Sequence, residues 1–263
     1  MTVPSHAQSA GHPEHSLAIH SGRIPLAEER ILRTSLAPLD KAIGGFEPSK
    51  TLLLDSDVRY VSELLHILCV RALAEFEEEV VWIDGGNAID PYILSALCKR
   101  HGLDRHEVLS MVNIARAFTA YQLASLVDGL LHEKVGESAP SLIIISSISD
   151  MFMDRDLRRS ESHQLLRGCA NEVERVTKES EAITVVTSHT PGRVEPEPRV
   201  ISLLSDAFDV YVQMRRGRNG ITVRVPDEGR STTFMPVPWN QMVLNDFTEG
   251  FYGKDCAYIP PRP

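Results

Sequence analysis

The sequence predicts one α/β domain in which a mostly parallel central sheet has helices on both faces and an antiparallel hairpin at its C-terminal flank. Segments typical of strands and of helices alternate as far as Thr187, which is the pattern of a parallel sheet with crossover connections. The segment 141–148, SLIIISSI, is apolar almost throughout, so both faces of that strand should be covered. The last strands are joined by RRGRN, which indicates a hairpin turn.

Length and composition indicate a globular protein. The chain has 263 residues, of which 43% are hydrophobic, enough for a substantial core. No apolar run approaches the roughly 20 residues of a membrane helix, and the N-terminal stretch lacks the apolar centre of a signal peptide, so we expect a cytoplasmic protein with no membrane partner.

Four widely spaced cysteines indicate reduced packing residues. The net charge of −9 argues against indiscriminate nucleic-acid binding, although a local basic face is compatible with it.

The predicted elements follow one another between two tails. Residues 1–24, rich in Ser, His, Pro and Gly, are expected to be a flexible N-terminal arm, residues 25–236 the core domain and residues 237–263 a C-terminal tail. The predicted strands are 51–54, 80–84, 112–115, 141–148, 182–187, 207–214, 220–225 and 231–235. The predicted helices are 24–32, 36–43, 61–73, 91–101, 103–111, 121–131 and a long one that follows Ser162 and reaches about Ser180.

Local signals support the ends of several elements. Gly44 and Gly45 stop the helix that precedes the first strand. Pro91 suits the first turn of its helix, and Gly102 ends that helix. The run 182–187 is rich in β-branched residues, as strands are. These signals support the alternation on which the fold class depends.

The segment 51–65, TLLLDSDVRYVSELL, has the shape of a phosphate-binding strand, loop and helix but lacks the residues that hold phosphate. A P-loop reads G-x-x-x-x-G-K-[ST], in which backbone amides and a lysine meet the phosphates. Here Asp55 takes the position of the first glycine, Tyr60 that of the second and Val61 that of the lysine, and only Ser62 fits. An ordinary buried strand followed by an amphipathic helix would also explain this segment taken alone.

Residues from about 31 to about 235 resemble the core domain of the RecA and archaeal RadA recombinase superfamily. The most specific stretch is 80–127, where VVWIDGGNAIDPYIL and the later ARAF are similar to RadA-type sequences in strand, turn, helix and arginine-alanine-phenylalanine segment. RILRTSLAPLDKAIGGFEPSKTLLL looks like the segment that leads into the family's P-loop strand, and SLIIISSISDMF looks like its Walker B strand. The resemblance implies a RecA-like P-loop NTPase fold.

The same resemblance implies that the charges of the ATPase site are missing. The Walker A lysine position is Val61, the Walker B aspartate position is Ser146, and the glutamate that activates water falls at Gly86. Phosphoryl transfer needs these charges to neutralise phosphate, hold magnesium and orient water. We therefore expect a pseudo-ATPase with no catalytic residue, no metal site and no required cofactor, in which Ser62 leaves room for weak nucleotide binding. Asp84 is either a turn residue or a functional carboxylate.

Arginines gather where the resemblance places two DNA-binding loops, at 154–162 and 189–204, and in the hairpin turn RRGRNG. Guanidinium groups on mobile loops would suit phosphate contacts, and a solvated surface of mixed charge would explain them equally well. His189 lies where the family often has a polar sensor residue, and we expect it to make a local hydrogen bond. The candidate DNA-binding residues are Arg155, Arg158, Arg159, Arg193, Arg199, Arg215, Arg216 and Arg218.

The leading interpretation is a non-catalytic RecA/RadA-like paralogue that acts in DNA recombination or repair by binding a recombinase or sister paralogue, single-stranded DNA, or both. RadA also has a helical N-terminal domain and a phenylalanine-containing linker that docks on the next subunit. The arm before residue 24 shows neither, so we do not expect a long filament. The alternative is a structural pseudo-ATPase subunit of a RecA-fold complex in RNA modification, signalling or motility. A weak ATPase with a rearranged site is a third possibility.

Overall fold

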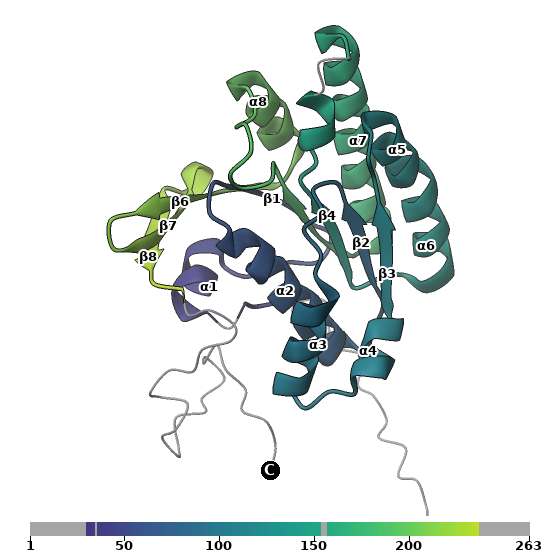
Figure 1. Ribbon diagram of the computed structural model, residues 1–263, viewed down its shortest axis with the longest axis vertical. Helices are drawn as coiled ribbons and strands as arrows, with labels where there is room; N and C mark the ends of the chain where they lie inside the picture. Colours follow the sequence, from purple (N-terminus) through teal and green to yellow (C-terminus); the bar gives the residue numbers. More distant parts are fainter. Residues whose placement is uncertain (1–29, 35, 154–156, 237–263) are drawn as a thin grey trace, which may run out of the picture.

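The structure, a computed structural model, describes residues 30–34, 36–153 and 157–236, and the strands of this part form one sheet (Figure 1). The strands are β1 (Thr51–Ser56), β2 (Val80–Asp84), β3 (Val112–Arg116), β4 (Leu142–Ser146), β5 (Ile183–Thr187), β6 (Val210–Gly217), β7 (Gly220–Val225) and β8 (Arg230–Phe234). The helices are α1 (Ala37–Ile43), α2 (Tyr60–Phe76), α3 (Pro91–Arg100), α4 (Arg105–Ser110), α5 (Ala120–Ser125), α6 (Leu131–Ser138), α7 (Arg159–Ser180) and α8 (Pro198–Ala207). A π-helical turn, η2 (Leu126–Leu130), joins α5 to α6, and short 3₁₀ turns lie at η3 (Asp150–Met153) and η4 (Pro226–Glu228).

The sheet has the order β3-β2-β4-β5-β1-β6-β7-β8. The strands from β3 to β6 pair in parallel, and β7 and β8 extend the sheet with antiparallel pairs. Parallel neighbours need crossover connections, which the helices supply. This arrangement confirms the predicted α/β domain with a mostly parallel sheet and an antiparallel C-terminal flank.

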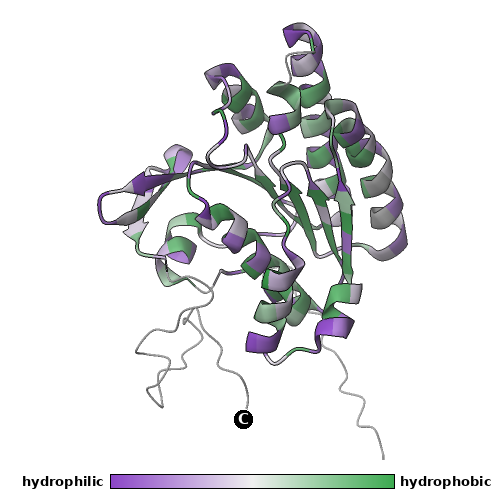
Figure 2. Ribbon diagram, viewed as in Figure 1, coloured by the Kyte–Doolittle hydropathy of each residue, from purple (hydrophilic) through white to green (hydrophobic). Residues whose placement is uncertain are grey.

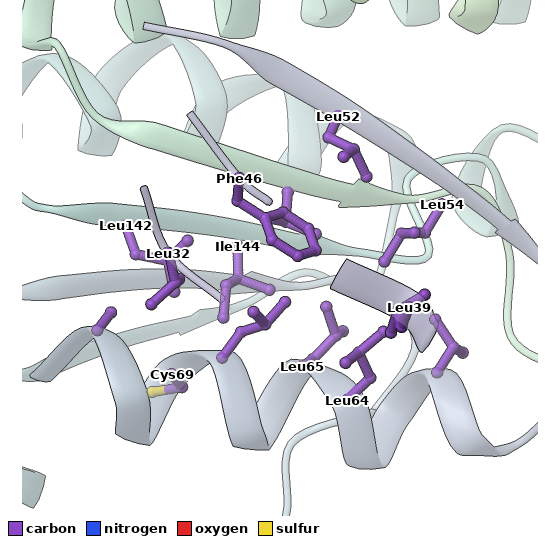
Figure 3. Packing of buried hydrophobic residues seen from close by; sticks show 14 of the residues in the cluster. Leu32, Leu39, Phe46, Leu52, Leu54, Leu64, Leu65, Cys69, Leu142 and Ile144 are labelled. Atoms are coloured by element: carbon purple, nitrogen blue, oxygen red, sulfur yellow. The ribbon is translucent and has the colours of Figure 1, made fainter. Parts of the chain in front are cut away.

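Apolar side chains fill both faces of the sheet because helices cover each face (Figures 1 and 2). Successive residues of a strand point to opposite faces. Leu52 and Leu54 of β1 therefore pack in the cluster that includes Leu64 and Leu65 of α2, while Leu53 packs in the cluster on the other face. Figure 3 shows the first of these clusters. Helices α1 to α4 contribute to that first cluster, and α5 to α8 contribute to the second.

The segment before α1 corrects one prediction. The predicted helix 24–32 lies mostly outside the described residues, and its described end is not helical. Leu32 instead forms a bridge with Phe46, with its amide donating to the Phe46 carbonyl at 2.9 Å and its carbonyl accepting at 2.8 Å. Gly45 has a φ of 98°, and a Cβ there would lie 2.4 Å from Ile31 Cγ2. This close approach requires glycine after α1.

Two helices shorten the predicted DNA-binding loops. Helix α7 begins at Arg159, so the second half of the predicted loop 154–162 is helical. Helix α8 occupies part of the predicted loop 189–204, with Pro198 in its first turn. Val200 and Leu204 of this helix are buried against the sheet, which explains why the segment is helical. Both loop predictions were therefore too long.

Two further elements extend beyond their predicted ends. The helix predicted at 121–131 changes to a π-helical turn and then continues as α6. Strand β6 reaches Gly217, so the hairpin turn consists of Arg218 and Asn219 alone. No helix in the described part of the chain combines the length and apolarity that a membrane span requires.

Candidate functional site

The carboxyl ends of β1, β2, β4 and β5 meet at one edge of the sheet, and buried polar side chains gather there. Parallel strands point the same way, and ligands of open α/β sheets bind outside these ends. A cleft of about 460 Å³ lies beside them, between the start of α2 and the turns that follow β2 and β5. The buried polar residues at this edge include Asp55, Ser56, Asp84, Ser146, Ser147, Thr187, Ser188 and His189.

Side chains of the loop after β1 and of the first turn of α2 are buried in the core. Val58, Tyr60 and Val61 are all buried. The amide of Val61 donates to the carbonyl of Val58 at 3.1 Å, and the amide of Ser62 donates to the carbonyl of Arg59 at 3.1 Å. In a P-loop, amides at the start of the helix point at bound phosphate. Here the chain's own carbonyls accept from these two amides.

The residues at the second glycine position and at the Ser/Thr position both make contacts within the fold. The Tyr60 ring packs edge-on against Phe234 of β8, with ring centroids 5.8 Å apart. Burial raises the pKa of the Tyr60 hydroxyl above its usual value, so the side chain stays neutral. Ser62 Oγ donates to the carbonyl of Ala88 at 3.0 Å. Ser62, the one residue that fits the P-loop pattern, thus connects α2 to the turn after β2.

Asp55, at the first glycine position, is a buried carboxylate with partners for both oxygens. Its Oδ2 accepts from the Arg215 guanidinium and, at 3.2 Å, from the Tyr211 hydroxyl. Its Oδ1 accepts from Ser188 Oγ at 2.7 Å. Arg215 also donates to the backbone carbonyl of Asp55 at 2.7 Å. Because a buried carboxylate without partners would be strongly destabilising, these contacts give Asp55 a structural role that joins β1 to β5 and β6.

His189 is buried beside the same carboxylate. Its Nδ1 lies 2.8 Å from Ser188 Oγ and 3.6 Å from Asp55 Oδ1. Since the Ser188 hydroxyl donates to Asp55, its oxygen accepts from His189 Nδ1, and the ring carries a proton on that nitrogen. The side chain also lines the cleft. The local hydrogen bond is the role that we expected for this residue.

Asp84 ends β2, and the turn that follows engages its carboxylate. Oδ1 accepts from the amides of Gly86 and Ala88 at 3.2 and 2.9 Å and from the hydroxyl of Ser146 at 2.8 Å. Oδ2 lies 3.3 Å from the Arg116 guanidinium. The side chain is fully buried. Of the two roles considered for Asp84, the structure shows that of a turn residue.

Ser146, at the predicted Walker B aspartate position, lies between two buried polar groups. Its hydroxyl donates to Asp84 and accepts from the indole N–H of Trp82 at 3.2 Å. The side chain has no exposed surface. The hydroxyl is thus fully engaged within the fold.

Gly86, at the predicted position of the water-activating glutamate, is closely surrounded by the side chains of Ser147 and Thr190. A Cβ there would lie 2.2 Å from Ser147 Oγ and 2.5 Å from Thr190 Oγ1. These two hydroxyl oxygens are hydrogen-bonded at 2.9 Å, and Thr190 also donates to Asp150 at 2.6 Å. The loops after β4 and β5 therefore occupy the space in which a side chain would begin.

The hairpin arginines do not all lie in the turn. Arg215 and Arg216 are on β6, and only Arg218 is in the turn, so the prediction of a turn with three arginines was wrong. Arg215 is half-buried and ion-paired with Asp55, whereas Arg216 and Arg218 are exposed. Arg155 lies outside the described residues.

The other candidate arginines lie close to the ends of α7 and α8 or in the loop after β5. Arg159 is 3.1 Å from Glu197, and Arg193 is 3.6 Å from Asp150. These pairs link the segments after β4 and β5, the two predicted DNA-binding loops. The exposed arginines of these segments are Arg158, Arg159, Arg193 and Arg199.

A buried histidine next to the site was not predicted from the sequence. His66 of α2 is fully buried, with Nδ1 2.6 Å from the Ser62 carbonyl and Nε2 accepting from the Asp90 amide at 2.8 Å. Burial lowers its pKa, so the ring is neutral and connects α2 to the start of α3. The sequence signal that could have identified His66 is a histidine within an apolar helix pattern. Within the described ranges, no group of three or more His, Cys, Asp or Glu side chains is arranged to hold a metal ion.

The strand order, the β1-loop-α2 unit inside the sheet and the polar strand ends around it define a RecA-type core. A model of the Rad51 family matches residues 32–200 of the chain. Because this match covers more than half of the sequence, the chain belongs to the Rad51 family. The predicted superfamily and fold are confirmed.

Curated relatives are similar over part of their length. The DNA repair protein RAD51 of Mycosarcoma maydis is 26% identical over 198 residues, covering 66% of this chain and 57% of that protein. The meiotic recombination protein DMC1/LIM15 homolog of Mus musculus is 26% identical over 205 residues, covering 70% and 56%. The meiotic recombination protein DMC1 homolog A of Oryza sativa subsp. japonica is 27% identical over 152 residues, covering 56% and 41%. The chain spans about half the length of these relatives.

Proposed function

We propose that this Rad51-family chain acts in DNA recombination or repair as a non-catalytic paralogue that binds a recombinase partner, single-stranded DNA, or both. Its similarity to proteins named for DNA repair and meiotic recombination supports the process. The packing around Gly86 is the main observation that supports the proposed loss of catalysis.

ATP hydrolysis in this superfamily needs a carboxylate that orients the attacking water. At Gly86 even the first carbon of a side chain would overlap Ser147 and Thr190, so a glutamate requires both of these side chains to move. Val61, at the lysine position, is part of the apolar cluster under α2. Val61 is 3% exposed and borders the cleft without offering a charge to a phosphate. Both observations support a fold that no longer assembles the hydrolytic site.

The open edge of β3 supports binding of a protein partner. Within the described sheet β3 pairs with β2 alone, so its other edge presents unpaired backbone groups. Ile114 of this strand is 48% exposed, and Phe118, just after it, is 72% exposed. An extended segment of another protein would add to the edge as a strand and cover both side chains. A Rad51-type recombinase is the partner that the family membership favours.

The exposed arginines support contacts to a phosphate backbone. Arg158 and Arg199 adjoin the two predicted DNA-binding loops, and Arg216 and Arg218 lie on or next to the hairpin turn. In a chain with a net charge of −9, such contacts would be local and would weaken as salt rises. The phosphate backbone that we propose for these arginines is that of single-stranded DNA.

Two measurements on the full chain test the proposal. We expect no magnesium-dependent release of phosphate from ATP above a protein-free control. We also expect a Rad51-type recombinase to be recovered from native extract after nuclease treatment. Phosphate release that is lost in a Ser62→Ala variant would contradict the loss of hydrolysis. Failure to recover a recombinase, together with no affinity for single-stranded DNA at low salt, would contradict the role in recombination.

A matched pair of variants locates the partner surface. Phe118→Ala removes an exposed ring beside the β3 edge and should reduce recovery of the recombinase. Tyr92→Ala removes a ring that is 85% exposed on α3. Helix α3 packs on the face of the sheet opposite α5, so this variant should leave recovery of the recombinase unchanged. Equal recovery with both variants would rule out the β3 edge as the docking surface.

A further inference from the structure

A groove of about 660 Å³ lies between α7 and the segment formed by α5 and η2. These helices lie side by side on the face of the sheet opposite α2 (Figure 1). The floor of the groove is apolar and includes Val127, Leu165 and Cys169. Burial raises the pKa of the Cys169 thiol to about 12, so the sulfur is a neutral part of this floor. The groove shares no lining residue with the cleft at the strand ends.

The rim of the groove is acidic. Its charged lining residues are Asp128, Glu161 and Glu172, and no Lys, Arg or His is among the described residues that line it. Glu161 accepts from the Tyr121 hydroxyl, and Glu172 is ion-paired with Arg175 at 2.6 Å. Asp128 is exposed and has no hydrogen-bond or ion-pair partner in the described part of the chain. The rim therefore offers carboxylates to a basic group and would repel phosphate.

Gly168 keeps the groove open although the helix that contains it does not require glycine. It lies inside α7, and nothing comes within 4 Å of a Cβ built on it. Glycine in a helix interior is about 1 kcal/mol less favourable than alanine. No close approach inside this chain accounts for that loss. Because Gly168 lines the groove, a larger residue there would fill part of the space above the floor.

The opposite wall carries a second irregularity. The π-helical turn η2 interrupts the path from α5 to α6, and Asp128 lies within it. Such turns are rare and recur at functional sites because they displace side chains from the helical register. The π-helical turn, the glycine at position 168 and the acidic rim thus all lie at the same groove.

We propose that this groove binds a basic amphipathic segment of a partner protein. An apolar side chain of the segment packs over Gly168 and the floor, and its Lys or Arg side chains face Asp128 and Glu161. The groove adjoins the β3 edge along the chain, because α5 begins two residues after Phe118. The inference rests on the partner-binding role proposed above and specifies the chemistry of the partner's segment.

A displayed library of random peptides, each long enough for about four helical turns, tests the inference when it is selected on the full chain. We expect enriched peptides to combine Lys or Arg with apolar residues at helical spacing. Their affinity, measured by fluorescence anisotropy on synthetic copies, should fall about tenfold or more for Gly168→Leu. Asp128→Lys should also weaken them and should favour copies in which the basic residues are replaced by Glu.

Controls separate loss of the groove from loss of the fold. Gly168→Leu should unfold at the same temperature as the original chain or higher, because leucine favours the helix. Gly168→Ala adds one methyl group and should retain binding. Enrichment of acidic peptides, equal affinity for Gly168→Leu, or no enriched peptide would overturn the inference. Basic peptides that bind in the groove, while no recombinase is recovered and single-stranded DNA is not bound at low salt, would contradict the proposed function and leave the groove assignment standing.

Discussion

Gly86→Ala tests the packing on which the proposed loss of catalysis depends. The new methyl group would lie 2.2 Å from Ser147 Oγ and 2.5 Å from Thr190 Oγ1, well inside contact distance. Moving either hydroxyl away would break hydrogen bonds, since the two bond each other and Thr190 also donates to Asp150. Overpacking of this kind costs about 1–3 kcal/mol, and we expect a loss of about 2 kcal/mol in the free energy of unfolding.

A second substitution identifies the cause of that loss. Ser147 has a φ of 57°, which glycine adopts freely, so Ser147→Gly removes the overlapping Cβ and Oγ from a tolerant backbone. In this background Gly86→Ala should cost at least about 1 kcal/mol less, as a coupling energy between neighbouring sites. Urea unfolding followed by circular dichroism measures all four proteins of the cycle. Gly168→Ala, in open space, is the control and should not destabilise the chain.

The reasoning would be refuted by either of two results. The first is a Gly86→Ala protein whose free energy of unfolding stays within about 0.5 kcal/mol of the original, the range of an ordinary surface change. The second is a coupling energy of zero, which would mean that the loss arises elsewhere. In the first case a side chain fits at this position, and steric crowding would not explain the absence of the glutamate. In the second case the contact with Ser147 is not the cause of the loss.

Three further outcomes are expected. Arg215→Ala should lower the free energy of unfolding by about 3 kcal/mol, because the buried Asp55 loses its cation, and urea titration measures this loss. Arg218→Ala should leave stability unchanged but reduce by about one the slope of log affinity for single-stranded DNA against log salt, measured by anisotropy. Burial lowers the pKa of His101 to about 4, below the roughly 6.5 of an unfolded chain, so the unfolded chain takes up the proton first. Stability should therefore fall as pH drops from about 6.5 to about 4, and His101→Gln should flatten that part of a urea-based pH profile.

The fold was predictable where single segments carry the signal. The strand Val80–Asp84 was placed to the residue because an apolar β-branched run ends in a glycine turn. Helix α8 was missed because PGRVEPEP indicates a loop, although Pro198 begins a helix whose burial depends on Val200 and Leu204. That burial is a tertiary contact with α7 and β1, which the local pattern does not contain.

The site was predictable only in part because its contacts join distant segments. The resemblance assigns Val61 and Ser146 to positions of the ATPase charges, and these assignments stay predictions. The pairing of Asp55 with Arg215 spans 160 residues and depends on β1 lying next to β6. A buried aspartate after an apolar strand indicates that a partner exists, but only the sheet order identifies it. The steric closure at Gly86 likewise depends on loops after two other strands.

The residues at the predicted positions of the ATPase charges each have close contacts within the fold, which makes their substitution by charged residues difficult. An aspartate in place of Ser146 would put a second carboxylate against Asp84 and would leave the Trp82 indole without its present partner. A lysine in place of Val61 would lose the packing of Val61 in the apolar cluster and would have to extend into the cleft. A glutamate in place of Gly86 would first need Ser147 to move. Each charge restored singly would thus destabilise the fold without completing a site. Under the proposed function, selection would therefore act on the surfaces of this scaffold.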